Sequence, residues 1–118
     1  MTEVAEPTEV RLKRAERVLE IDFDDGQRFV LPAEYLRVES PSAEVQGHSP
    51  EQRQLVSDKS GVGISSLEPT GHYAIRIVFD DGHSTGIYSW DYLHRLGREY
   101  AHRWAVYLKA IEAAGLSR

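Results

Sequence analysis

The sequence predicts an α+β domain in which two duplicated β-hairpin units form a mostly antiparallel sheet, with C-terminal helices packed on one face. The string Phe-Asp-Asp-Gly occurs at Phe23–Gly26 and again at Phe79–Gly82, each time after an alternating apolar run. A Tyr-Leu pair follows each copy, at Tyr35–Leu36 and at Tyr92–Leu93. Apolar residues then recur every three or four positions from Trp90 to Ile111, as on one face of a helix. Two copies are too few for a solenoid, so we expect them to share one core.

Length and composition indicate a single domain that folds without covalent or metal cross-links. The chain has 118 residues, and we expect a disordered, polar stretch over residues 1–10 and one domain over residues 11–118. The absence of Cys excludes disulfides, thiolate zinc sites and thiol catalysis. We expect neither a secretory signal nor a membrane-spanning segment, and therefore a cytoplasmic protein without a membrane partner.

The charge balance argues against a nucleic-acid partner. The formal net charge is −5, from 19 acidic and 14 basic residues, whereas binding to a phosphate backbone depends on clustered cations. Two basic clusters depart from this average. The one near the start of the chain, which we interpret as a solvated segment leading into the domain, comprises Arg11, Lys13, Arg14 and Arg17. The other lies on the C-terminal segment with His94 and His102 and comprises Arg95, Arg98, Arg103 and Lys109. We therefore expect a protein partner rather than a nucleic acid.

The first unit reads as a hairpin followed by a short helix. Val18–Phe23 alternates apolar and acidic residues, as a half-buried strand does. Asp25-Gly26 is a strong hairpin turn, and Arg28–Leu31 returns as the second strand. Pro32–Leu36 then predicts one helical turn that places its Tyr and Leu in the core.

The second unit follows an irregular insert. The insert covers Glu39–Gly63 and contains a possible helical turn at Pro50–Leu55. A strand at Ile64–Pro69 is expected next, and then a hairpin with strands at Tyr73–Phe79 and Ser84–Tyr88. In the first of these two strands, one face is expected to carry Tyr73, Ile75, Ile77 and Phe79, and the other face Ala74, Arg76 and Val78.

The C-terminal segment is predicted to be helical. Ser89 is a good N-cap, and Gly97 interrupts the apolar stripe, so we expect two helices or one kinked helix with its break there. The aromatic end of the stripe, with Trp104, Tyr107 and Ile111, offers more apolar surface than one sheet covers. A homodimer through this face is one possible arrangement.

Two strings resemble a known family. They are LRVESPSAE at Leu36–Glu44 and EPTGHYAIRIVFDDGHSTGIYSWDYL at Glu68–Leu93. Over about Glu9–Tyr107 the chain resembles the gamma-butyrobetaine hydroxylase-like N-terminal domain, which also occurs alone in small bacterial proteins of unknown function. In the hydroxylases this domain precedes a catalytic domain dependent on 2-oxoglutarate and iron, which these 118 residues do not include. A related domain is fused to P-loop ATPases implicated in iron-sulfur cluster assembly, so the resemblance implies that setting.

The resemblance also implies the positions of a zinc site made of three Cys and one His. In this sequence those positions hold Ser40, Ser42, Val45 and His83. Serine hydroxyls are poor zinc ligands and valine is none, so the site is degenerate and we expect neither metal nor another cofactor. We expect His83 to hydrogen-bond to the segment from Ser40 to Glu44 instead.

The Asp-Asp-Gly strings have two interpretations. Asp80, Asp81 and His83 are candidates for a hard-metal or acid-base cluster, with the aspartates of the first copy as a second carboxylate pair. However, Asp-Gly is also what a tight hairpin requires, and both copies carry the acids at the same place, so we favour the turn. His83 differs because Gln27 takes its place in the first copy.

One face of the predicted helical segment carries His94, Arg98 and His102, which are spaced by four residues. We expect no metal between the two histidines, because two helical turns separate them by about 12 Å. A solvated face is the simpler interpretation, and contact with a partner is the alternative.

These observations favour a non-enzyme. No nucleophile-base pair, P-loop or dinucleotide motif is present. The leading hypothesis is a protein-binding adaptor, with an iron-sulfur assembly ATPase as the partner that the resemblance implies. A metal-binding or regulatory module of a separately encoded oxygenase is the alternative, and a small hydrolase would need a deep polar pocket around His83 and the aspartates. The candidate partner-binding residues are Asp80, Asp81, His83, His94, Arg98 and His102.

Overall fold

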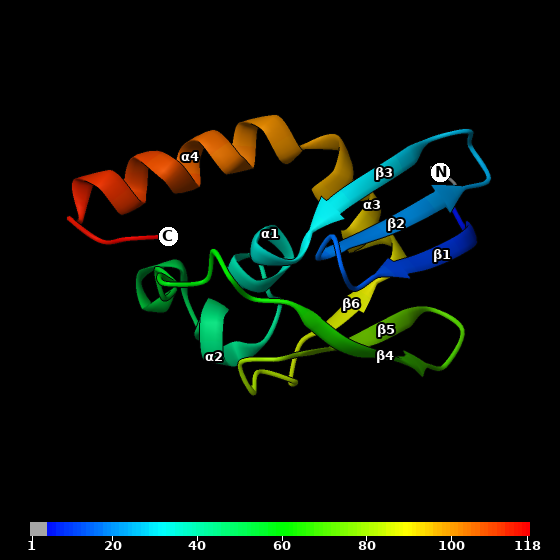
Figure 1. Cartoon of the computed structure of the whole chain (residues 1–118), viewed down its shortest axis with the longest axis horizontal. Coiled ribbons are helices and arrows are strands. Elements are labelled where there is room, and N and C mark those ends of the chain that lie inside the picture. Colours follow the sequence, from blue (N-terminus) through cyan, green and yellow to red (C-terminus); the bar gives the residue numbers. More distant parts are fainter. Residues whose placement is uncertain (1–4) are drawn as a thin grey trace.

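The chain contains two copies of a β-β-β-α unit followed by a long helix (Figure 1). The computed structural model describes residues 5–118. The first copy comprises β1 Pro7–Lys13, β2 Val18–Phe23, β3 Arg28–Pro32 and α1 Ala33–Val38. The second comprises β4 Ile64–Thr70, β5 Ala74–Phe79, β6 Ile87–Ser89 and α3 Trp90–Arg98. The insert between the copies holds α2 Ala43–Gln46 and the 3-10 turn η1 Pro50–Gln52, and the last helix is α4 Tyr100–Ala113.

The α+β class is confirmed, and the strands form two three-stranded antiparallel sheets rather than one, in the orders β1-β2-β3 and β4-β5-β6. The copies agree in detail, since β1 has a register shift between Pro7 and Glu9 and β4 has one between Ile64 and Ser66, 57 positions later. The two sheets share one core through side chains, which β2 and β5 supply at alternate positions: Leu19, Ile21, Phe23, Ile75, Ile77 and Phe79. Side-chain packing thus joins the copies without edge-to-edge strand pairing.

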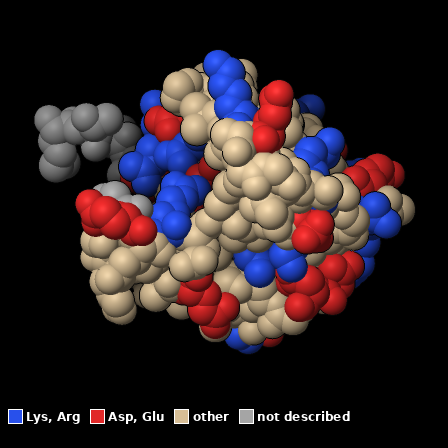
Figure 2. Space-filling model, turned by 90° about the vertical axis from the view of Figure 1, so that its left-hand side faces the viewer, with Lys and Arg blue, Asp and Glu red and all other residues tan. Residues whose placement is uncertain are grey.

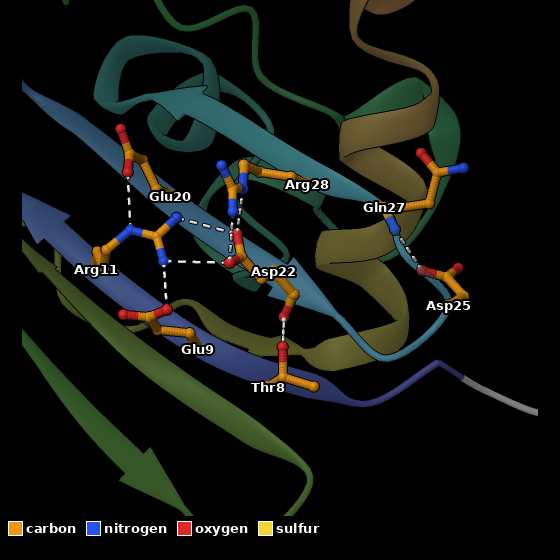
Figure 3. Close-up of polar contacts among 8 residues, drawn as sticks. All are labelled: Thr8, Glu9, Arg11, Glu20, Asp22, Asp25, Gln27 and Arg28. Carbon is orange, nitrogen blue, oxygen red and sulfur yellow. Dashed lines mark hydrogen bonds and ion pairs between the residues drawn. The ribbon is translucent and has the colours of Figure 1, made fainter.

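Strand β1 corrects the expectation of disorder for residues 1–10. Residues 7–10 belong to β1, and residues 1–4 lie outside the described residues. Val10 stands opposite Ile21 and packs against the core, which gives this polar segment a partly buried anchor. On the other face Arg11, expected to be solvated, lies 2.9 Å from Glu20 and 3.0 Å from Asp22 (Figure 3). Strand pairing and this ion-pair network hold the segment in place.

Helices α1 and α3 are joined by reciprocal hydrogen bonds. Tyr35 on α1 donates its hydroxyl to the carbonyl of Leu96 on α3, over 2.7 Å. Tyr92 on α3 donates to the carbonyl of Glu39 just after α1, over 2.5 Å. The two donors and the two acceptors occupy equivalent positions of the repeat, 57 residues apart. Each tyrosine therefore satisfies a carbonyl at the C-terminal end of the other helix, where the helix itself offers no partner.

The helical segment breaks at Glu99 rather than at Gly97. Gly97 lies inside α3, and a Cβ there would fall 2.3 Å from the ring of Phe29. This glycine is therefore required by close packing of α3 on β3. Ser89 caps α3 as expected, since its Oγ accepts the Tyr92 N–H over 3.0 Å. Tyr73, expected to share a strand face with Ile75, Ile77 and Phe79, lies at the turn before β5 and is 64% exposed.

Helix α4 runs beyond both sheets and over α1 (Figure 1). Its inner side packs in a second apolar cluster made of Val38, Tyr107 and Ile111, with Val56 from the insert. Helix α4 thus covers the end of α1 and part of the insert, and its first turns pack against the main core through Tyr100 and Trp104. Among the described residues, no helix is long and apolar enough to cross a membrane.

Candidate functional site

The first aspartate of each Asp-Asp-Gly string ties its turn to the strand that opens the unit. Asp24 exchanges two hydrogen bonds with Glu6: its N–H donates to the Glu6 carbonyl over 2.8 Å, and its Oδ1 accepts the Glu6 N–H over 3.1 Å. Asp80 makes the same pair with Gly63, at 3.0 Å and 3.0 Å. In both copies the carboxylate therefore ties the turn to the residue just before the first strand of the unit.

The second aspartate closes the turn itself. Asp25 Oδ1 accepts the N–H of Gln27 over 2.9 Å (Figure 3), and Asp81 Oδ1 accepts that of His83 over 3.0 Å. The following glycines have φ of +86° and +92°, which disfavours any residue with a side chain. Turn geometry thus accounts for both strings.

Asp81 makes further contacts that use its charge. Its Oδ2 lies 2.8 Å from Arg37 Nε and 2.7 Å from Lys59 Nζ. Burial by itself raises the pKa of Asp81, but the bonds from Lys59, the His83 N–H and Arg37 outweigh it and hold the pKa at about 2. A carboxylate neutralised by two cations is a poor ligand for another cation.

His83 forms the expected hydrogen bond to the insert. Its Nε2 lies 2.8 Å from Ser40 Oγ, and its Nδ1 lies 3.0 Å from Glu44 Oε2. Burial and the charge of Arg37 lower the pKa of His83, against the opposing effect of Glu44, so the ring is neutral near pH 7. Because the carboxylate only accepts, Nδ1 carries the proton and the Ser40 hydroxyl donates to Nε2.

The hydrogen bonds from Ser40 to His83 and from His83 to Glu44 follow the order of a hydrolytic triad, but the exposure of the serine and of the acid is reversed. In such a triad the nucleophile is accessible and the acid is buried. Here Ser40 is 0% exposed, whereas the Glu44 side chain is 63% exposed. Neither of the two hollows described below contains Ser40 or His83. The Ser40 hydroxyl is therefore shielded from solvent, and neither of these two hollows brings a substrate to it.

The degenerate zinc positions do not fit zinc. Val45 is buried at 2% exposure and offers no donor atom. The Ser42 hydroxyl is bonded to that of Thr85 over 2.6 Å, and the Ser40 hydroxyl also accepts the Ser42 N–H over 3.2 Å. Within residues 5–118 no group of three or more His, Cys, Asp or Glu side chains has the spacing to hold a metal ion. Hydrogen bonds between hydroxyls and the imidazole occupy the place of the implied site.

The three residues predicted to share one helix face lie on two helices: His94 and Arg98 on α3, and His102 on α4. His94 Nε2 lies 2.7 Å from Asp25 Oδ2, and Arg98 Nε donates to His94 Nδ1 over 3.0 Å. These two residues thus join α3 to the turn of the first copy. His102 lies apart from them, on α4, where it lines a groove.

That groove was not predicted from the sequence. It has a volume of about 570 Å³ and lies between α4 and residues 53–56. Its apolar lining comprises Val38, Leu55, Val56, Val106, Tyr107 and Ala110. Val106 is 53% exposed and Leu55 is 40% exposed, and Tyr107 fixes the insert by donating to the Val56 carbonyl over 2.8 Å. We call this hollow the α4 groove.

A basic pocket of about 460 Å³ adjoins the α4 groove. The two hollows share Arg53 and Arg103, and the rest of the pocket is lined by Pro41, Gln46, Ile87, Ser89, Tyr92 and Arg95. Buried Glu39 holds both shared arginines, since its Oε1 lies 3.1 Å from Arg53 Nη2 and 2.9 Å from Arg103 Nη1. Lys and Arg side chains gather at the upper left of the face shown in Figure 2, beside broad uncharged surface.

Sequence reasoning missed both hollows because their walls come from segments far apart. The insert was expected to be irregular, so Arg53 and Leu55 carried no prediction. Val106 lies beside the apolar stripe of α4 rather than within it, and an apolar residue next to a stripe was the one available signal.

A duplicated β-β-β-α fold with two three-stranded antiparallel sheets and C-terminal helices defines a class of small α+β domains. Residues 10–94 match the family described as gamma-butyrobetaine hydroxylase-like, N-terminal. The chain therefore belongs to this family. No curated protein matches it.

Solved structures agree with the family assignment. A protein from Acidithiobacillus ferrooxidans, of unknown function and belonging to the DUF971 family, is 41% identical with a TM-score of 0.66, over 78% of this chain and 92% of that one. Two proteins solved by NMR in solution are 42% and 47% identical, with TM-scores of 0.85 and 0.83. They cover 98% and 100% of this chain, and 91% and 90% of their own. The similarity thus extends over nearly the whole chain and names no activity.

Proposed function

We propose that this chain is a non-catalytic, cytoplasmic protein-binding module that docks a partner through the α4 groove. The observation that carries the proposal is a groove of about 570 Å³ that combines apolar side chains with polar and charged ones and at which Val106 and Leu55 remain 53% and 40% exposed. Burying the exposed half of such a side chain contributes about 1 kcal/mol, so these residues are useful anchors for a partner.

The polar residues first considered for chemistry support the same proposal. Ser40 is hydrogen-bonded to His83, and Asp81 accepts the His83 N–H and pairs with Arg37. These contacts hold the insert and the second turn in place. Such groups stabilise structure and leave no free base beside an accessible nucleophile. The α4 groove, in contrast, keeps accessible apolar side chains, as expected for an interaction module.

Iron-sulfur cluster assembly is the proposed setting. Its support is the family itself, because a related domain is fused to P-loop ATPases implicated in that process. A stand-alone copy would then bring its groove to a separate ATPase or cluster-handling protein.

Affinity purification from the native cell tests this function with a matched pair of variants. Val106→Lys places a charge in the α4 groove, and Val30→Lys places the same charge on β3 at a residue of the same type and the same 53% exposure. We expect the wild type and Val30→Lys to retain a cluster-assembly ATPase or scaffold and Val106→Lys to lose it. Equal retention by both variants would contradict docking at the groove, and recovery of no cluster-handling protein by the wild type would remove the setting.

Metal analysis of untagged protein tests the alternative. Stoichiometric zinc or iron would contradict the interpretation of Ser40, Ser42 and Val45, and would favour a metal-binding or regulatory module of an oxygenase.

A further inference from the structure

We infer that the α4 groove and the basic pocket bind one continuous peptide segment of the partner, in which an acidic side chain lies a few residues from apolar ones. The inference rests on the proposed function and adds the chemistry of the partner segment. Its starting point is the sharing of Arg53 and Arg103 by both hollows, which makes the two a single bipartite surface.

The basic pocket has the composition of a carboxylate site. Three guanidinium groups line it, from Arg53, Arg95 and Arg103, and no acidic residue is among its lining residues. This local excess stands against a net charge of −5 for the whole chain. Planar guanidinium groups bind carboxylates through paired, charge-assisted hydrogen bonds.

The neighbouring acids do not use up these donors. Glu39 pairs with Arg53 and Arg103, and Glu99 pairs with Arg103 over 2.8 Å, so three arginines face two carboxylates. Arg95 forms no ion pair with any residue from 5 to 118. Its guanidinium lies over the ring of Tyr92, 5.2 Å from the centroid, which leaves its N–H edges free for an incoming anion.

The α4 groove requires the apolar part of the same ligand. A free anion would account for the three arginines but would leave Val106 and Leu55 uncovered. A purely apolar segment would cover them but would desolvate Arg53 and Arg103 at the border without replacing their water, which is unfavourable. A segment with apolar side chains in the groove and a carboxylate against Arg95 satisfies both halves.

Selection from a random peptide library displayed on phage, with the full chain as bait, tests this inference. We expect the enriched sequences to combine Asp or Glu with nearby aliphatic or aromatic residues. The most enriched sequence, made as a fluorescein-labelled peptide, is then titrated by anisotropy against the wild type and two variants. Arg95→Gln removes a pocket guanidinium, and Arg98→Gln removes an exposed arginine from the same last turn of α3 that lines neither hollow.

We expect Arg95→Gln to weaken binding at least about tenfold, or about 1.4 kcal/mol, and Arg98→Gln to change it by less than about twofold. Binding of the peptide by Val106→Lys should fall as strongly, whereas Val30→Lys should bind as the wild type does.

Three results would overturn the inference. They are enrichment of sequences without acidic residues, equal weakening by Arg95→Gln and Arg98→Gln, and failure to enrich any sequence. Displacement of the peptide by inorganic phosphate gives a further check. The inference is supported if phosphate displaces the peptide only at concentrations far above that of the peptide. If phosphate binds as tightly as the peptide does, the pocket is a small-anion site instead. The co-purification with Val106→Lys and Val30→Lys decides the proposed function separately, so either can fail alone.

Discussion

Removal of one buried hydroxyl, in Tyr35→Phe, should destabilise the fold measurably. Tyr35 is 0% exposed and donates over 2.7 Å to the carbonyl at the end of α3. A buried acceptor left without its donor costs about 1 to 3 kcal/mol, and we expect about 2 kcal/mol here. With an unfolding entropy of about 2.1 cal/mol/K per residue, 118 residues give about 0.25 kcal/mol/K, so the melting temperature should fall by about 8 °C.

Urea unfolding followed by circular dichroism measures this loss, with Tyr73→Phe as the control. Tyr73 is 64% exposed and its hydroxyl has no hydrogen bond to any described residue, so removing it should change the unfolding free energy by less than about 0.5 kcal/mol. Tyr92→Phe, at the equivalent position of the other copy, should fall between the two because Tyr92 is less deeply buried. A loss in Tyr35→Phe no larger than in Tyr73→Phe would refute the idea that reciprocal bonds couple the copies.

Three further changes test other parts of the fold. Gly97→Ala should lower the unfolding free energy by about 1 to 3 kcal/mol in urea, because its Cβ would meet the Phe29 ring, although alanine favours helices; an unchanged value would contradict the close packing. Asp81, with its pKa held near 2, contributes stability above pH 4 that is lost as pH falls towards 2, so Asp81→Asn should flatten that decline in acid titrations, and a parallel decline would contradict it. Burial raises the pKa of Tyr88, so the unfolding free energy should fall as pH rises above about 10, where the unfolded phenol ionises; a flat profile there would exclude this linkage.

The repeat was the most predictive feature of the sequence. The Asp-Asp-Gly strings predicted both hairpin turns, and the structure shows that each aspartate has a defined backbone partner. The same repeat contained an unused signal for β1, since 57 positions before β4 lies Pro7, where β1 begins. Polar composition concealed it, because alternate residues of β1 face solvent or an ion-pair network.

The candidate site was less predictable because side-chain contacts between distant segments define it. Resemblance indicated that Ser40 and His83 lie together, and they are 2.8 Å apart. However, nothing in the sequence relates Arg53 to Arg103, which meet only because buried Glu39 binds both. The predicted helix break was misplaced at Gly97 for a similar reason. This glycine allows α3 to pack closely on β3, a contact between distant segments, and the break itself is at Glu99.

The most direct test of docking is an amide chemical-shift map of isotope-labelled protein on addition of the recovered partner. The account predicts that the largest shifts occur at groove and pocket residues, such as Val56, Arg95 and Val106, with little change at the second turn. Shifts concentrated at Asp80, Asp81 and His83, with the α4 groove unaffected, would contradict it and return the binding site to the turn.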